Sequence, residues 1–230
     1  VQAIGIDGRD EPDPTIEAMA ERYVEALAAR TDGPHLLGGF SGGGLIALDM
    51  GRRLQQLGHE VRGVVLFDSV PPGAMSLPRW SSRWNVIRHV ATAGPRATMP
   101  YLKTRFGGRL LTLLGPQLEH GAEPVPPELR DQVEEGVRDL YDHFTEVALL
   151  HRPSVVEFDV AVIKADLMWP YQPEDYHWSE YVAGSLDVVT TPGDHESMFR
   201  HPDVTDLWAR IGPILDRWDD HPHDEPSDGT

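Results

Sequence analysis

Ser41 is the residue of this chain whose setting points most directly to chemistry. It lies between Gly39 and Gly43, in the sequence GFSGG. The largely apolar run 35–37 precedes this stretch, and residues 45–50 after it are typical of a helix. A serine framed by glycines between a strand and a helix indicates a sharp turn that projects a nucleophilic hydroxyl above a sheet. We expect side chains at either glycine position to collide with neighbouring backbone.

Asp68 and His195 are candidates for the acid and the base that an activated serine requires. A serine hydroxyl is a poor nucleophile near neutral pH, so it needs a base, and the base needs an acid to orient it. Asp68 ends the strand-like run 61–67 and His195 follows the run 186–190, which gives the chain order Ser, acid, His. Asp166 follows another strand-like run and is a rival acid, and position alone does not separate the two.

Strand-like and helix-like segments alternate along most of the chain. Strands are predicted at residues 1–6, 36–40, 61–67, 158–164 and 186–190, and helices at residues 15–30, from the glycine turn to 57, at 173–183 and, kinked by Pro213, at 202–218. Such alternation indicates an α/β fold with a mostly parallel sheet flanked by helices. The chain has 230 residues and 40% hydrophobic content, so we expect one core and a single domain over residues 1–230.

Residues 69–155 break this alternation, because they hold proline clusters and helical patterns but no convincing strand. An apolar stripe at helical spacing is formed by Val133, Val137, Leu140, Tyr141, Phe144, Val147 and Ala148. We expect a helical insertion that covers the site as a lid. The alternative is that these helices simply pack on the sheet. Residues 219–230 are rich in acid, proline and glycine, and we expect a disordered tail there.

The composition argues against several classes of function. A formal net charge of −17 disfavours nucleic acid and anionic membranes as partners. No apolar run approaches the ~20 residues that cross a bilayer, and no signal peptide opens the chain, so we expect a cytoplasmic protein. The absence of cysteine removes disulfides, thiolate nucleophiles and thiolate metal sites. His221 and His223 lie in the acidic tail, where a solvated role is favoured, and no metal site is expected.

Four segments of the chain resemble the thioesterase domains that end nonribosomal peptide and polyketide synthases, which belong to the α/β-hydrolase superfamily. The segments are residues 36–44, 56–61, 64–72 and 192–198. The resemblance covers nearly the whole chain and implies the α/β-hydrolase fold with a helical lid insertion. The family acid occupies an Asp-Ser/Thr-x-x-Pro position, which is Asp68 here, so the resemblance favours Asp68 over Asp166.

The resemblance also implies a reaction. A carrier protein would deliver an acyl or peptidyl chain as a phosphopantetheine thioester, so that the domain needs no cofactor of its own. Ser41 would attack this thioester with His195 as base and Asp68 orienting the base, which forms an acyl-enzyme. Water would then release an acid, or an internal nucleophile would close a ring. The backbone N–H of Gly42 would donate to the developing oxyanion.

Two departures from the family pattern bear on the kind of thioesterase. The family's second oxyanion donor precedes the stretch that matches residues 1–8, so we expect that an N-terminal segment is missing from this sequence. Standalone editing thioesterases commonly carry His before the serine and Met after it, where this chain has Phe40 and Gly42. This difference favours a domain of a larger synthase. The alternatives are a standalone editing enzyme, a small-molecule esterase of the same fold and, least favoured, a non-catalytic interaction module.

Residues 79–109 form a basic segment in an acidic protein, with arginine and lysine interleaved with aromatic residues and no acidic residue. Carrier proteins of these systems are typically acidic and bring a phosphate, so a basic lid face is a plausible docking surface. We name Arg83, Arg88 and Arg105 as candidate docking residues. The alternative is an ordinary solvated helical face.

Overall fold

The computed structural model describes residues 13–28, 34–72, 127–166, 173–193, 195, 197–200 and 202–220, with the backbone alone at 127–138 and at 220. Its strands form one parallel sheet in the order β1-β2-β3-β4. Their bounds are His35–Phe40 for β1, Val61–Phe67 for β2, Val160–Ala165 for β3 and Leu186–Thr191 for β4. The predictions for a strand at 1–6, for a missing N-terminal segment and for the tail beyond 220 fall outside the described residues.

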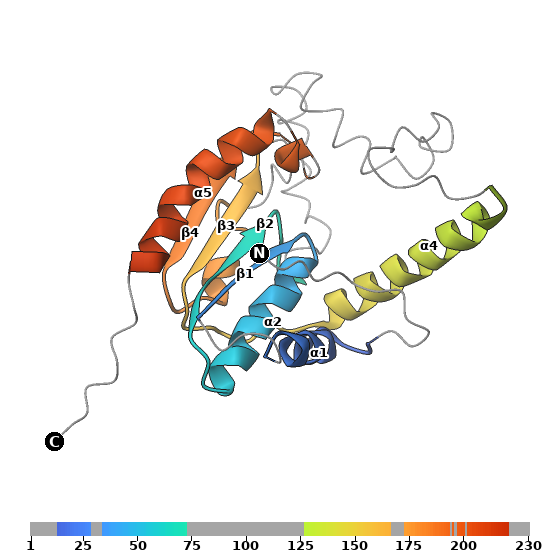
Figure 1. Cartoon of the computed structure of the whole chain (residues 1–230), viewed down its shortest axis with the longest axis horizontal. Helices are drawn as coiled ribbons and strands as arrows, with labels where there is room; N and C mark the ends of the chain where they lie inside the picture. The colour runs from blue at the N-terminus through green and yellow to red at the C-terminus, as the bar shows by residue number, and fades with distance from the viewer. Residues whose placement is uncertain are drawn as a thin grey trace.

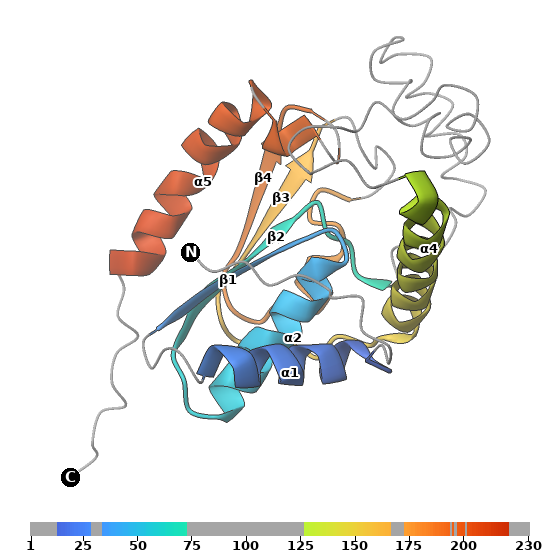
Figure 2. The ribbon, with the colours of Figure 1, turned by 45° about the vertical axis from the view of Figure 1, so that its right-hand side comes forward.

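Helices cover both faces of this sheet, as the alternation of segments predicted. Helices α1 (Ile16–Ala28) and α2 (Gly43–Gln56) lie on one face, and α5 (Asp203–Asp220) lies on the other (Figures 1 and 2). Two buried apolar clusters fill the two interfaces. A parallel strand covered on both sides loses the alternation of polar and apolar residues. This explains the nearly continuous apolar run of β2, of which only two residues are even partly exposed.

The helix predicted at residues 173–183 is wrong. This segment forms turns and one short 3-10 helix, η2 (Trp178–Glu180). Tyr176 and His177 have φ angles of 54° and 70°. A right-handed helix cannot pass through residues in the left-handed region, so the segment folds back instead of continuing as a helix. In contrast, the predicted helix through Pro213 is present, as α5.

Helix α4 (Pro127–Leu150) is the described part of the predicted insertion, while residues 73–126 lie outside the described residues. Near its end, Val147 and Ala148 are buried in the cluster that α1 and α2 also form. In both ribbon views α4 lies on the α2 side of the sheet. Tyr141 is 69% exposed, so this member of the predicted stripe does not pack in the core. The lid role of the insertion stays a prediction.

The glycine turn between β1 and α2 is tight on one side only. A side chain at Gly39 would place its Cβ 2.2 Å from the carbonyl oxygen of Gly43. Real Cβ atoms essentially never come so close to backbone, which confirms the expectation for Gly39. No atom of the described residues lies within 4 Å of the corresponding position at Gly43, so the expectation of a collision with neighbouring backbone there is wrong. Ser41 between them has a φ of 55°, in the left-handed region that non-glycine residues rarely adopt.

We therefore expect Gly39→Ala and Gly43→Ala to behave differently. Gly39→Ala forces backbone apart and should lower the free energy of unfolding by about 1–3 kcal/mol. Gly43→Ala adds a methyl group to open space at the start of a helix, so stability should be unchanged or slightly raised. Urea unfolding followed by circular dichroism measures both. Equal stability of the two variants would contradict the geometry of the turn.

Candidate active site

The structure brings Asp68 and His195 together. Nδ1 of His195 lies 2.6 Å from Oδ2 of Asp68. The Asp68 side chain is fully buried, whereas 28% of the His195 side chain is exposed. One ring edge of His195 thus faces a buried carboxylate. Such a pair can hold an imidazole in one orientation and stabilise its charged form.

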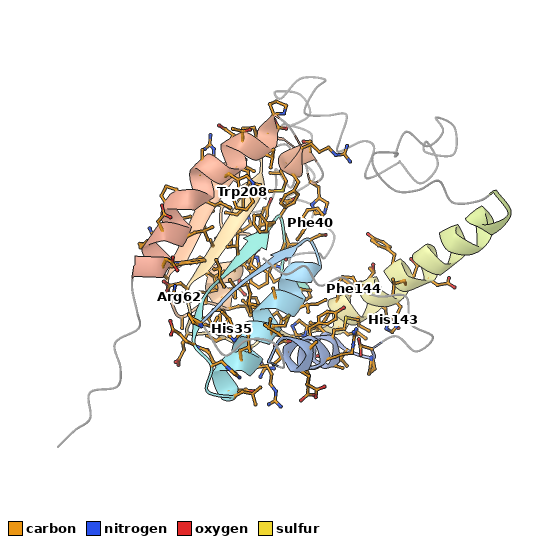
Figure 3. All side chains as sticks on the ribbon, viewed as in Figure 1. His35, Phe40, Arg62, His143, Phe144 and Trp208 are labelled. Atoms are coloured by element: carbon orange, nitrogen blue, oxygen red, sulfur yellow. The ribbon has the colours of Figure 1, made fainter. Side chains whose placement is uncertain are left out.

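Ser41 stands at the same edge of the sheet. Its backbone N–H donates to the carbonyl oxygen of Phe67, 2.9 Å away, so the parallel hydrogen-bond ladder continues one residue past β1. The residue before it, Phe40, lies with its ring centroid 4.4 Å from that of His195. Figure 3 shows Phe40 at the carboxyl end of β1. The imidazole therefore lies beside the turn that carries the serine.

Aromatic contacts fix the loop that carries His195. Shortly after His195, the chain forms the short helix η3 (Ser197–Phe199). The ring of Phe199 meets Phe40 edge-on at 5.1 Å and Phe67 at 5.3 Å between centroids. These residues end β1 and β2, so η3 is packed against the strands that precede Ser41 and Asp68. Phe199 could not be predicted from the sequence pattern, because an aromatic residue in a loop carries no periodic signal.

Asp166, the rival acid, has a different partner. Its Oδ1 accepts a hydrogen bond from the backbone N–H of Gly193, at 3.0 Å. Gly193 has a φ of 106°, a conformation that glycine adopts without strain. Partial burial raises the pKa of the Asp166 carboxyl. Asp166 thus shapes the start of the His195 loop, while the hydrogen bond from the imidazole goes to Asp68.

Gly42, the candidate oxyanion donor, lies directly before α2 and against α4. It is the N-terminal cap residue of α2, where unpaired N–H groups carry a partial positive charge. A Cβ built on Gly42 would lie 2.0 Å from the ring of Phe144. Figure 3 shows Phe144 on the part of α4 near α2. Helix α4 therefore reaches the turn itself.

Tyr176 is a neighbour of the site that the sequence analysis missed. Its hydroxyl lies 2.8 Å from Oδ1 of Asp68, to which it donates. It belongs to the segment that was predicted as a helix. A helix there does not predict that this tyrosine contacts Asp68. The predicted docking residues Arg83, Arg88 and Arg105 lie outside the described residues, so their role stays a prediction.

One group of side chains could hold a metal ion among the residues that the structure describes. It consists of Glu17, Asp49 and His151. Nδ1 of His151 lies 3.0 Å from a Glu17 oxygen, and its Nε2 lies 3.5 Å from Asp49. Because each ring nitrogen already faces a carboxylate, these contacts link α1 and α2 to the residue that follows α4. In the described part of the chain, no helix is long and apolar enough to cross a membrane.

Comparison with known proteins identifies the family. The family described as Thioesterase domain matches residues 1–214. The chain belongs to this thioesterase family. It is 28% identical over 192 residues to the orsellinic acid synthase ArmB of Armillaria mellea, covering 82% of this chain and 8% of that protein. The chain thus spans less than a tenth of the length of this relative.

Solved structures agree on the fold. The NocB thioesterase domain, in a covalent complex with a fluorophosphonate nocardicin G analog, superimposes with a TM-score of 0.59 at 24% identity, covering 90% of this chain and 78% of that one. A four-domain nonribosomal peptide synthetase bound to AMP and glycine gives a TM-score of 0.60 at 21% identity, covering 95% of this chain and 17% of that one. The thioesterase therefore has the predicted α/β-hydrolase fold.

We expect Asp68→Asn and Asp166→Asn to separate the two acids of this thioesterase. Asp68→Asn leaves the imidazole without its carboxylate and should lower kcat for a soluble acyl thioester by a factor on the order of 10⁴. Asp166→Asn keeps an oxygen that can accept from Gly193, so kcat should change little. A larger loss in Asp166→Asn would reverse the assignment.

Asp166 also predicts how the stability of the folded protein depends on pH. The raised pKa of Asp166 means that the folded state binds its proton more readily than the unfolded state. Its contribution to stability is therefore complete below the pKa of the unfolded chain and is lost as pH rises through the folded pKa. Asp166→Asn, which cannot titrate, should gain stability relative to the wild type as pH rises through that range. Denaturant midpoints at a series of pH values measure this trend.

Proposed function

We propose that this thioesterase domain releases an acyl or peptidyl chain from the phosphopantetheine of a carrier protein through an acyl-enzyme on Ser41. The observation that carries the proposal is the 2.6 Å contact between His195 and the buried Asp68, beside a strained serine turn. Membership of the thioesterase family supplies the substrate class, a thioester. The relatives named polyketide synthase, and the synthetase structure, support a carrier protein as the partner.

The hydrogen bonds define the direction of proton transfer. An ionised carboxylate only accepts hydrogen bonds, so Nδ1 of His195 carries a hydrogen and donates it to Asp68. The opposite nitrogen, Nε2, then has a lone pair that can take the proton of Ser41. As the serine oxygen bonds to the carbonyl carbon, that proton moves to Nε2 and is passed to the departing pantetheine sulfur as the carbon–sulfur bond breaks. The products are a serine ester and a free carrier thiol.

The second half of the reaction reverses these roles. Nε2 of His195 removes a proton from the acceptor, which attacks the ester and restores the Ser41 hydroxyl. Water as acceptor gives hydrolysis, and an amine or hydroxyl of the bound chain gives macrocyclisation. The N–H of Gly42 would stabilise the oxyanion in both halves, because it stands at the positive end of α2. The domain needs no metal or bound cofactor for these steps.

The neighbours of the serine support a domain of a synthase over a standalone editing enzyme. Editing enzymes commonly have Met where this chain has Gly42, and the ring of Phe144 occupies the space that such a side chain would need. Phe40, in the place of their His, stacks beside His195. A small-molecule esterase would share the same three catalytic residues, so only the choice of substrate distinguishes it.

The acyl-enzyme is the direct test. We expect incubation with an acyl N-acetylcysteamine thioester to add the mass of one acyl group to the intact protein, at Ser41 in a peptide map. Ser41→Ala should remove this adduct, because Ser41 carries the only hydroxyl in GFSGG, and should abolish turnover. The matched control is Ser69→Ala, a buried serine outside the proposed mechanism. Turnover by Ser41→Ala at the wild-type rate would refute the proposal, and faster turnover of simple esters than of thioesters would favour the esterase.

Carrier docking is tested by charge. We expect combined reversal of Arg83, Arg88 and Arg105 to Glu to slow acylation from a carrier-bound substrate by about tenfold, because an acidic carrier would then be repelled. Acylation from a small soluble thioester should keep its rate. Stopped-flow measurement with both donors compares them directly. Equal loss on the two substrates would remove the docking hypothesis and leave the acyl-enzyme mechanism untouched.

A further inference from the structure

The buried carboxylate of Asp68 divides its two oxygens between different partners. Oδ2 faces His195. Oδ1 accepts from the hydroxyl of Tyr176 at 2.8 Å and from the backbone N–H of Ala165 at 3.3 Å. A carboxylate held at one oxygen by donors on two segments cannot rotate freely about its own axis. The orientation of Oδ2 toward the imidazole therefore depends on what holds Oδ1.

Burial and backbone hydrogen bonds hold Tyr176 in this position. It is fully buried, and it has a φ of 54°. Its backbone N–H donates to the carbonyl oxygen of Pro173 at 3.1 Å, which closes a turn. Two residues later, the indole N–H of Trp178 donates to the carbonyl oxygen of Ser69, directly after Asp68 in the chain. The segment that presents the phenol is thus tied to the same strand end as the acid.

Strained backbone gathers around this contact. Among the described residues, the non-glycine residues with positive φ are Ser41, Asp68, Tyr176 and His177. Such conformations are unfavourable for non-glycine residues and persist only where the surroundings enforce them. Tyr176 thus shares a rare conformation with the nucleophile and the acid. In this conformation the hydroxyl of Tyr176 reaches Oδ1 of Asp68.

A cation faces the ring of Tyr176. Nζ of Lys164 lies 4.7 Å from the ring centroid and donates to the carbonyl oxygen of Pro173. Burial lowers the pKa of this lysine, while nearby acidic groups, among them Asp68, oppose the shift. A positive charge over a phenol ring draws electron density from it and strengthens the hydroxyl as a donor.

We propose that Tyr176 is a positioning residue of this thioesterase, whose hydroxyl holds Oδ1 of Asp68 so that Oδ2 orients His195. The inference rests on the proposed function, because it acts through the same three residues. Tyr176 acts through Asp68. Its hydrogen bond withdraws charge from the carboxylate and so limits how strongly Asp68 attracts the proton of the imidazolium.

Charged groups near this contact come from several elements, and Tyr176→Phe changes none of these side chains. Among the described residues, Lys164 on β3 interacts with Asp68 and with Glu174 and Asp175 in the turn of Tyr176, and Asp166 after β3 interacts with Asp203 and Arg210 on α5. Because none of these is altered, a change in the pH dependence of the reaction reports on the hydrogen bond itself.

Tyr176→Phe is the central experiment. It keeps the ring beneath Lys164 and removes only the donor. We expect kcat/KM for a soluble acyl thioester to fall roughly tenfold, mainly through kcat, because a donor to a charged group is lost. The acid limb of the rate–pH profile should move upward by roughly half a pH unit, since Asp68 then holds the imidazolium proton more tightly. Tyr181→Phe is the matched control, because its ring contacts Trp178 on the same segment.

A second replacement at position 176 should shift the acid limb of the rate–pH profile in the opposite direction. Incorporation of 3-fluorotyrosine at position 176 preserves the shape of the side chain and makes the phenol a stronger donor. The acid limb should then move to lower pH. Opposite displacements in the two proteins cannot arise from a loss of packing, and the fluorinated protein tests the inference even where Tyr176→Phe does not fold.

The outcomes distinguish the inference from the proposed function. Acid limbs at the wild-type position in both replacements, in folded protein that still forms the Ser41 adduct, would overturn the positioning role and leave the acyl-enzyme mechanism intact. A wild-type protein without thioester turnover, or with turnover that Ser41→Ala retains, would instead overturn the proposed function and the positioning role with it.

Discussion

The buried charge of Asp68 is the constraint around which the site is organised. An isolated carboxylate without hydrogen bonds is several kcal/mol less stable in an apolar interior than in water. Here the imidazole of His195, the hydroxyl of Tyr176 and the N–H of Ala165 surround it. These donors lie 127, 108 and 97 residues after Asp68 in the sequence, respectively. The fold brings all three donors together at one buried carboxylate, so the stability of this acid and the assembly of the site depend on the same contacts.

The parallel sheet provides this convergence because its hydrogen-bond ladder does not stop where the strands end. The backbone N–H groups of Ser41, Asp68 and Asp166 donate to the carbonyls of Phe67, Ile163 and Thr191, each on the neighbouring strand. In a parallel sheet all carboxyl ends lie at one edge, so each such bond fixes a polar residue at that edge. The sheet hydrogen bonds thereby fix the backbone positions of these residues. At Ser41 and Asp68 the left-handed φ angles then turn the chain away from the direction of the strand.

Sequence patterns predicted the parts of this arrangement that burial dictates. The run 61–67 matches β2 to the residue, because a strand covered on both faces is apolar along most of its length. The choice of Asp68 over Asp166 needed the family resemblance, since both follow a strand and differ only in which side chain meets the histidine. Periodicity failed at residues 173–183, where positive φ angles imposed by tertiary contacts override helical spacing. The prediction for Gly43 was wrong for another reason: the motif around Ser41 does not reveal which of its two glycines is crowded.

The serine turn is also in close contact with helix α4 of the insertion. The ring of Phe144 lies in the space that any side chain at position 42 would enter, so the close approach of α4 requires glycine there. The same glycine carries the N–H proposed to bind the oxyanion, and we expect the apolar ring beside it to keep water from one side of that donor. A hydrogen bond to a developing charge is stronger in such a setting than in open solvent. The small size of Gly42 thus affects two properties together. It determines how closely α4 can approach the turn, and thereby how much water can reach the proposed oxyanion site.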